Sequence, residues 1–156
     1  MARVVTISTF LAAPPTRILE EVNKTRLLLF VTHPIMRFTP VDPPILPESW
    51  APGDFIVRMH FFGILPLGRQ TIGLSMPPMA DDVRYIRDNG HSKLIRRWDH
   101  LISIAPEDGG TRYTDRVEID AGVLTPFVVA FAHMFYRHRQ RRWRQLVARD
   151  FDYGRF

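Results

Sequence analysis

The sequence predicts an α+β fold in which a curved, seven-stranded antiparallel sheet grips one long C-terminal helix, with two short helices after the first strand. β-branched or alternating segments occupy most of the chain, and a long amphipathic segment from Thr125 to Val147 follows them. Nine of the 13 prolines lie between residues 34 and 78, which excludes a long helix there. Because a sheet of seven strands twists and curls, we expect it to bend around the helix and leave space between them.

The N-terminal part predicts one strand and two helices. Residues 3–11 are rich in β-branched side chains and predict the first strand. The prolines at 14–15 suit the first turn of a helix, where the backbone N–H is not needed. The helical spacing of apolar residues over 18–31 is interrupted at 23–25, so we expect two short helices. They end at His33, because a residue before proline avoids the helical region.

The middle of the chain predicts an antiparallel meander. Residues 64–68 predict a turn between two strands, and the Asn89-Gly90 pair and the segment 106–110 predict hairpins. The expected strands are residues 35–41, 55–62, 69–76, 83–88, 94–105 and 111–121.

The C-terminal helix has clear start and spacing signals. Thr125 is the predicted N-cap and Pro126 the first helical residue. The helix has about 23 residues, or ~35 Å. Its predicted core stripe consists of Phe127, Phe131, Met134, Phe135, His138, Arg142 and Leu146.

Length and composition limit the class of protein. A chain of 156 residues fits a single domain, residues 1–156, with residues 148–156 as a candidate C-terminal extension. The absence of cysteine excludes disulfides, thiol catalysis and iron–sulfur clusters. No apolar run approaches the ~20 residues of a membrane span, and the N-terminus lacks a signal-peptide core, so we expect a cytoplasmic protein.

The net charge of +5 is concentrated near the C-terminus. After residue 133 there are seven arginines and two aspartates, so the rest of the chain is neutral. Because cations are favoured at a helix C-terminus, a solvated helix end is the preferred interpretation. Contact with nucleic acid or an anionic surface is a weaker alternative.

Four segments occur in an order and spacing typical of a known superfamily: Ile64-Leu65-Pro66-Leu67-Gly68, Asp88 with Trp98-Asp99-His100, Thr111 to Val117, and Phe135 to Trp143. With the order of elements, they resemble the START-like, or SRPBCC, superfamily of polyketide cyclases and Bet v 1-like proteins. The resemblance covers nearly the whole chain and implies a helix-grip fold. Lys93-Leu94-Ile95 departs from the Gly-Pro-Phe type of segment that many relatives carry, which affects the expected shape of that hairpin and access to a cavity.

His100 and Asp115 are the candidate catalytic residues. Alternation places His100 on one face with Trp98, and Asp115 on the matching face of the next strand. If the hairpin is centred as its turn suggests, His100 lies opposite Asp115 and Trp98 lies opposite Val117. The pair is either a general acid and base or a hydrogen-bonded pair that fixes strand register, and we favour the second. We expect Asp88 to cap or close its own hairpin.

The candidate ligand-binding residues are aromatic or apolar, as in the wall of a pocket for a greasy ligand. They are Trp98, Tyr113, Val117, Met59, Phe61, Phe127, Phe131 and Phe135. On the strand at 55–62, alternation does not decide whether Met59 or the pair Arg58 and His60 faces inward.

The favoured function is binding of a small hydrophobic molecule, such as a lipid, polyketide or other metabolite, in an internal apolar cavity. The alternative is a cyclase or dehydratase that uses His100 and Asp115 as an acid–base pair, and the resemblance permits either. Phosphate-binding, dinucleotide-binding and zinc-protease motifs are absent, so we expect no metal and no cofactor. The expected partner is a small hydrophobic molecule; nucleic acid is disfavoured, and a homodimer through edge strands is left open.

Overall fold

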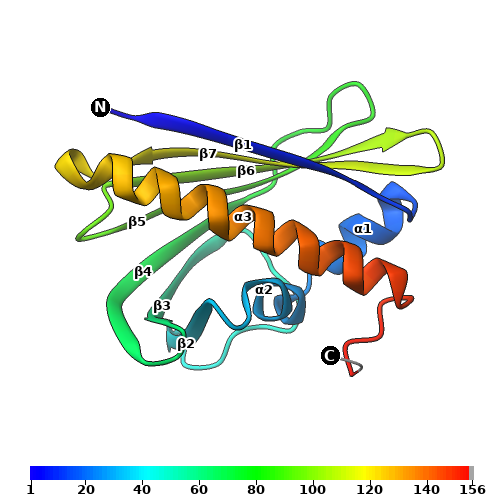
Figure 1. Ribbon diagram of the computed structural model, residues 1–156. Helices are drawn as coiled ribbons and strands as arrows, with labels where there is room; N and C mark the ends of the chain where they lie inside the picture. The colour runs from blue at the N-terminus through cyan, green and yellow to red at the C-terminus, as the bar shows by residue number, and fades with distance from the viewer. Residues whose placement is uncertain (155–156) are drawn as a thin grey trace.

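Seven strands form one antiparallel sheet in the order β1-β7-β6-β5-β4-β3-β2, and this sheet curves around the long helix α3 (Figure 1). The computed structural model describes residues 1–154. The strands are β1 (Arg3–Leu11), β2 (Met36–Asp42), β3 (Gly53–Phe61), β4 (Leu65–Ser75), β5 (Arg84–Ser92), β6 (Arg97–Glu107) and β7 (Gly110–Asp120). The helices are α1 (Pro15–Val22), α2 (Thr25–Thr32), the short η1 (Gly122–Leu124) and α3 (Thr125–Ala148). This architecture confirms the predicted fold class.

The helix α3 does not cover the sheet evenly. It packs closely on β1 and β7, the first and last strands, which are neighbours in the sheet. Within the described chain it does not approach β3, β4 or β5 to the same extent. The short helices α1 and α2 lie near the C-terminal end of α3 (Figure 1). One side of the concave sheet face is therefore closed by α3, while the other side is further from it.

The register of β6 and β7 differs from the prediction by two residues. His100 pairs with Val117 and Asp115 pairs with Ile102, because both strands continue through Glu107 and Gly110 to a tight turn at 108–109. The predicted turn was longer. A shift of two residues keeps every side chain on its predicted face, since the side-chain period of a strand is two.

The Asn89-Gly90 pair lies inside β5 and does not form a turn, contrary to the hairpin signal. Gly90 pairs with Trp98 of β6. A Cβ at Gly90 would lie 2.8 Å from both the Nε2 atom of Gln70 and the backbone oxygen of Thr71. The glycine is therefore required for the close approach of β4 to β5, and this cross-strand packing overrides the local turn preference.

The turn between β3 and β4 is shorter than predicted. Residues 65–68 belong to β4, where Leu65 pairs with Phe61. The chain reverses at residues 62–64, and Phe62 and Gly63 have φ values of 50° and 73°. The turn falls here because Gly63 adopts this backbone conformation without strain.

The buried face of α3 is rotated relative to the predicted stripe. Met134 is 44% exposed and Phe127 is 74% exposed, while His138 and Arg142 lie at the boundary with α2. The rotation follows from packing on two sides, because α3 contacts α2 as well as the sheet. The buried side chains are those of Thr125, Ala132, Phe135, Tyr136, Arg139, Gln140, Trp143 and Leu146.

Thr125 is the first residue of α3 and not its N-cap. Its Oγ1 donates a hydrogen bond to the Gly122 carbonyl oxygen at 2.7 Å and accepts one from the Ala121 N–H at 3.0 Å. The hydroxyl thus joins η1 to the start of α3, so the predicted threonine holds the helix start through a different hydrogen bond.

The segment after α3 turns back over α1 and α2. Tyr153 donates a hydrogen bond to the buried carboxylate of Glu21 at 2.6 Å. Phe151 and Tyr153 pack against the core cluster that contains Trp143 and Leu146. The described part of the predicted extension, residues 148–154, thus contributes to the core, and residues 155–156 lie outside the described residues.

The observed burial along α3 predicts effects of very different size for two truncations. Leu146→Ala should lower the free energy of unfolding by about 2–5 kcal/mol, because Leu146 is fully buried and the change leaves a cavity. Met134→Ala should change it by less than about 0.5 kcal/mol. Denaturant unfolding followed by circular dichroism measures both. A larger loss for Met134→Ala would contradict the packing described here.

Candidate ligand-binding cavity

A cavity of about 440 Å³ lies between the concave face of the sheet and the helices α2 and α3. Most of the side chains in its wall are apolar, and they come from β2 to β6 as well as both helices. Leu65, Leu94 and Phe127 belong to the wall yet are exposed on the outside, so they mark the mouth. The mouth therefore lies where the β3–β4 turn, the β5–β6 turn and the start of α3 meet.

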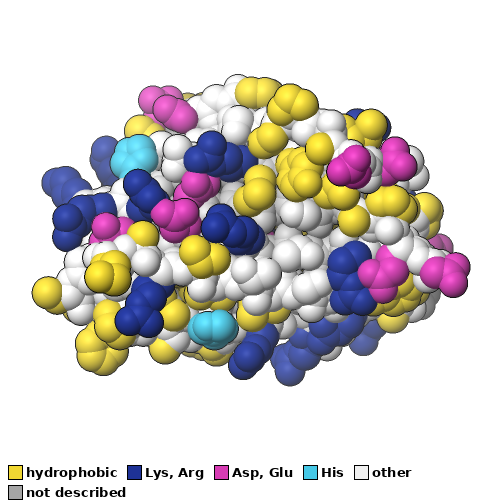
Figure 2. All heavy atoms as spheres, turned by 90° about the horizontal axis from the view of Figure 1, so that it is seen from above, with side chains coloured by type: hydrophobic (Ala, Val, Ile, Leu, Met, Phe, Trp, Pro, Cys, Tyr) yellow, Lys and Arg dark blue, Asp and Glu magenta, His cyan; other side chains and the backbone are white. Residues whose placement is uncertain are grey.

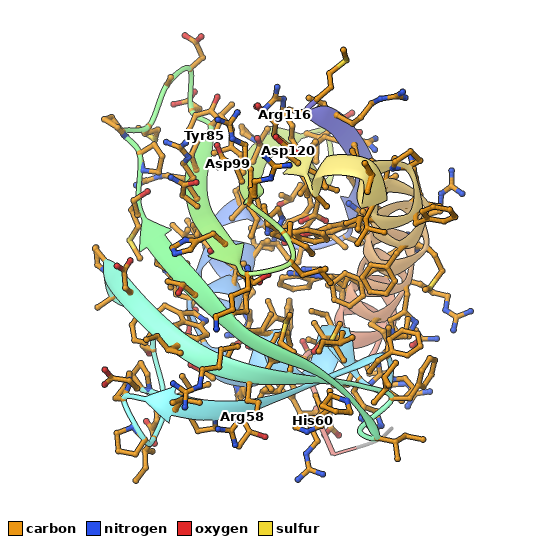
Figure 3. The ribbon with its side chains drawn as sticks, turned by 90° about the vertical axis from the view of Figure 1, so that its left-hand side faces the viewer. Arg58, His60, Tyr85, Asp99, Arg116 and Asp120 are labelled. Carbon is orange, nitrogen blue, oxygen red and sulfur yellow. The ribbon has the colours of Figure 1, made fainter. Side chains whose placement is uncertain are left out.

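The inward face of β3 is the apolar one. Met59 lines the cavity, and Phe55 and Val57 are buried beside it in the core. Figure 3 shows Arg58 and His60 on the outer side of the sheet, pointing away from the space next to α3. The sequence left open whether Met59 or the pair Arg58 and His60 faces inward, and the structure shows that Met59 does.

Most predicted wall residues meet in the cavity, but two do not. Trp98, Met59, Phe61, Phe127, Phe131 and Phe135 line the cavity, and so does His100. Tyr113 and Val117 are fully buried outside it. Both belong to β7, the strand that α3 covers directly, so their side chains pack into the core and not into the open space. Asp115, on the same strand, is also absent from the wall.

His100 and Asp115 form a buried polar pair, with His100 in the wall and Asp115 behind it. The Nε2 atom of His100 lies 2.7 Å from Oδ1 of Asp115, and the two residues are 4% and 1% exposed. The other carboxylate oxygen accepts a hydrogen bond from Gln140 of α3 at 2.9 Å, and Gln140 also donates to the Ile7 carbonyl oxygen. The network joins β6, β7, β1 and α3, so it can fix their relative positions.

The protonation of this pair follows from burial and hydrogen bonding. Burial lowers the pKa of His100 and outweighs the opposing effect of Asp115, so the imidazole is neutral. Burial alone would raise the pKa of Asp115, but the hydrogen bond from His100 and the nearby charge of Arg139 lower it. His100 therefore donates from Nε2 to an ionised carboxylate, and Nδ1 is left as an acceptor.

Asp88 bridges two strands from inside the cavity wall. Its Oδ1 accepts a hydrogen bond from the Gly73 N–H at 2.9 Å, where the β4–β5 ladder is interrupted between the pairs Thr71–His91 and Leu74–Asp88. The expectation that Asp88 closes its own hairpin is therefore wrong, because its partner lies on β4 and not on β6. Burial raises the pKa of Asp88 to about 7, although the Gly73 hydrogen bond and the charge of Arg139 oppose the shift.

Three polar residues of the wall were not among those predicted from the sequence. They are Gln70, Tyr136 and Arg139. Tyr136 accepts a hydrogen bond from Trp98 Nε1 at 3.2 Å and stacks on the Trp98 ring. Arg139 lies four residues after Phe135 and four before Trp143, and that spacing marks it as an inward position among the seven arginines.

The C-terminal arginines are only partly available to solvent. Arg139 is buried, Arg142 donates a hydrogen bond to the Phe30 carbonyl oxygen, and Arg144 donates one to Thr9. Figure 2 shows a row of Lys and Arg side chains along one edge and others beside Asp and Glu side chains. Contact of this segment with nucleic acid or an anionic surface stays a prediction.

Among the described residues, none of the helices combines the length and apolar character that a membrane span requires. In the same part of the chain, no group of three or more His, Asp or Glu side chains is arranged to hold a metal ion.

The raised pKa of Asp88 predicts a stability that depends on pH. Between pH 3.8 and about 7 the unfolded state releases the Asp88 proton while the folded state keeps it, so this residue lowers stability as pH rises. Asp88→Asn removes this effect and retains an oxygen for the Gly73 N–H. Relative to wild type, the variant should gain on the order of 2–4 kcal/mol across this window and change no further above it.

Urea unfolding at a series of pH values measures this difference. Asp99→Asn is the control, because the hydrogen bond from Arg87 lowers the pKa of Asp99 and places its titration below the window. A constant difference between Asp88→Asn and wild type would show that Asp88 is ionised throughout.

Loss of Asp115 should be more costly than loss of a partly exposed carboxylate. Asp115→Ala leaves the neutral His100 Nε2–H and one N–H of Gln140 without an acceptor in the core, so we expect a loss of about 1–3 kcal/mol for each unsatisfied donor. The matched control is Asp99→Ala, which breaks a pair with the exposed Arg87 and should cost about 0–1 kcal/mol. Chemical denaturation of both variants checks this, and equal losses would contradict a structural role for the buried pair.

Solved structures with similar folds come from several sources. Protein CV1439 from Chromobacterium violaceum has a TM-score of 0.66 and 14% identity, covering 92% of this chain and 96% of that one. A START superfamily protein from Mycobacterium smegmatis has a TM-score of 0.63 and 12% identity, covering 94% and 97%. Ara h 8.0201 has a TM-score of 0.64 and 10% identity, covering 95% and 99%. These similarities establish the START/Bet v 1-like helix-grip fold.

The search of the curated proteins found no match. A family model described as "Domain of unknown function (DUF8410)" matches residues 10–147. Because this match extends from β1 to the end of α3, the chain belongs to the DUF8410 family.

Proposed function

We propose that the protein binds a small, mainly apolar molecule in the cavity between the sheet and α3. The observation that carries the proposal is a cavity of about 440 Å³ whose wall is predominantly apolar and which opens at a defined mouth. Ligand pockets for small molecules have volumes of about 300–1,000 Å³ and the same mixture of many apolar groups with a few polar ones. The resemblance to START-like proteins agrees with this function.

The wall can supply the affinity by burial alone. Each buried methylene contributes about 0.8 kcal/mol, so a ligand with ten or so such groups gains roughly the 8 kcal/mol of a micromolar complex before the costs of association. The aromatic side chains Trp98, Phe131 and Phe135 offer flat surfaces to rings or chains. The proposal is therefore for an apolar metabolite or lipid, without a choice between these classes.

Catalysis is the second candidate, and one observation favours it. His100 lies in the wall and is oriented through Nε2 by Asp115, so Nδ1 remains available to a bound molecule. In a cyclase or dehydratase, His100 would contact the substrate as the base and Asp115 would position it from behind. The same contacts also suit a purely structural pair, so binding is the conclusion that the cavity supports best.

Filling the cavity should weaken the binding of a neutral dye. Nile red should bind the wild-type protein with increased fluorescence, and Met59→Trp should weaken its binding at least tenfold by occupying the space. The matched control is Leu29→Trp, since Leu29 is exposed on α2 and is not part of the wall. Circular dichroism checks that each variant folds. Equal dye binding by wild type and Met59→Trp would show that the dye binds elsewhere.

A further inference from the structure

Arg139 is a buried cation in the cavity wall without a matching carboxylate. Its side chain comes from the middle of α3 and is 8% exposed. Within residues 1–154 it forms no salt bridge, and its Nε atom has no hydrogen-bond partner. An unpaired buried charge is costly to a folded protein, and a guanidinium is well suited to bind a carboxylate through two parallel hydrogen bonds.

The acidic side chains nearest to Arg139 are engaged elsewhere. Both carboxylate oxygens of Asp115 accept hydrogen bonds, one from His100 and one from Gln140. Asp88 accepts the Gly73 N–H, and its pKa of about 7 leaves it largely protonated in mildly acidic solution. Among residues 1–154, neither carboxylate lies within ion-pair distance of the guanidinium, so they compensate its charge only at longer range.

Aromatic contacts hold Arg139 in place without using its hydrogen-bond donors. The guanidinium carbon lies 5.1 Å from the centre of the Tyr136 ring and 5.8 Å from that of the Phe135 ring. Such contacts act through the face of the ring and do not use a hydrogen-bond donor, and the Nε donor is left without an acceptor.

Other polar groups of the wall gather near the same place. Asp88 pairs directly with His100 across β5 and β6, and both line the cavity. Gln70 of β4 lies beside Asp88, since both side chains approach the same point above Gly90. The Oε1 atom of Gln70 is buried and has no hydrogen-bond partner. One region of an otherwise apolar wall thus contains a cation and several neutral hydrogen-bonding groups.

We infer that the cavity takes an amphipathic monocarboxylate, such as a fatty acid, with its carboxylate on Arg139 and its apolar part toward the mouth. This inference rests on the proposed function and specifies its ligand class. Arg139 follows the mouth residue Phe127 by twelve positions, or about 18 Å along α3, so the head lies deep and the tail extends outward. A single negative charge matches the single guanidinium. A dianion such as a phosphate monoester would add a second charge in a region that already contains ionised Asp115.

The test compares an acid with the alcohol of the same chain length. Isothermal titration calorimetry at about pH 6, where an aliphatic carboxylic acid is ionised, measures dodecanoic acid and dodecanol with the wild-type protein. We expect dodecanoic acid to bind at least tenfold more tightly. Arg139→Met should bind dodecanol as wild type does and lose at least tenfold in affinity for dodecanoic acid. Arg137→Met, on the exposed side of the same helix, should match wild type for both ligands.

The outcomes separate the two proposals. If wild type binds the acid and the alcohol equally, the role of Arg139 is overturned while the proposed apolar cavity stands. The same holds if Arg139→Met still prefers the acid. Binding of neither molecule overturns the proposed function as well. The wild-type comparison requires no variant, so the inference can be tested even if Arg139→Met fails to fold.

Discussion

One helix cannot cover the concave face of a seven-stranded sheet, and this constraint shapes the whole molecule. The helix α3 lies against β1 and β7, where the fully buried Ala132 packs with Val5 and Val117. On the other side, the sheet curves away toward β3 and β4, and α2 together with the wall aromatics closes only part of the space. The cavity is thus the volume that a single helix leaves unfilled, with its mouth at the N-terminal end of that helix.

The polar side chains of the interior lie along the border between these two sides. Gln140 and Asp115 are on the closed side, His100 spans the border, and Arg139 and Asp88 face the open side. On the closed side, each oxygen of Asp115 has a protein partner, as expected for polar groups in a packed core. On the open side, Arg139 Nε and Gln70 Oε1 have none. The Tyr113 hydroxyl and the Trp143 Nε1 atom also lack a partner, but neither residue lines the cavity. Of these four atoms, those of Arg139 and Gln70 are therefore the ones available to a bound molecule.

The sequence was sufficient to predict the fold and to bring His100 near Asp115, because both depend on patterns that tolerate small errors. The predicted β6–β7 register was wrong by two residues. His100 and Asp115 still lie on the same face, because side chains alternate along a strand and a shift of two residues keeps each on its side of the sheet. This alternation identifies the inner face of a strand but not the part of that face that a helix covers. It could therefore not show that Tyr113 and Val117 lie under α3. Arg139 was missed for a related reason: seven arginines in one segment resemble a solvated helix end, and only the rotation of α3 decides which one is inside.

The buried arginine also explains why the wall is not simply a packing defect. An incompletely filled core could be relieved by larger apolar side chains, and an apolar residue at position 139 would avoid the cost of burying a charge. The chain has instead a guanidinium there, held against Tyr136 and Phe135 with its Nε donor unpaired. In a wholly apolar cavity, a greasy molecule could enter in several orientations with similar energy. A single charged group at the deep end favours one orientation, so the apolar wall supplies affinity and Arg139 supplies direction.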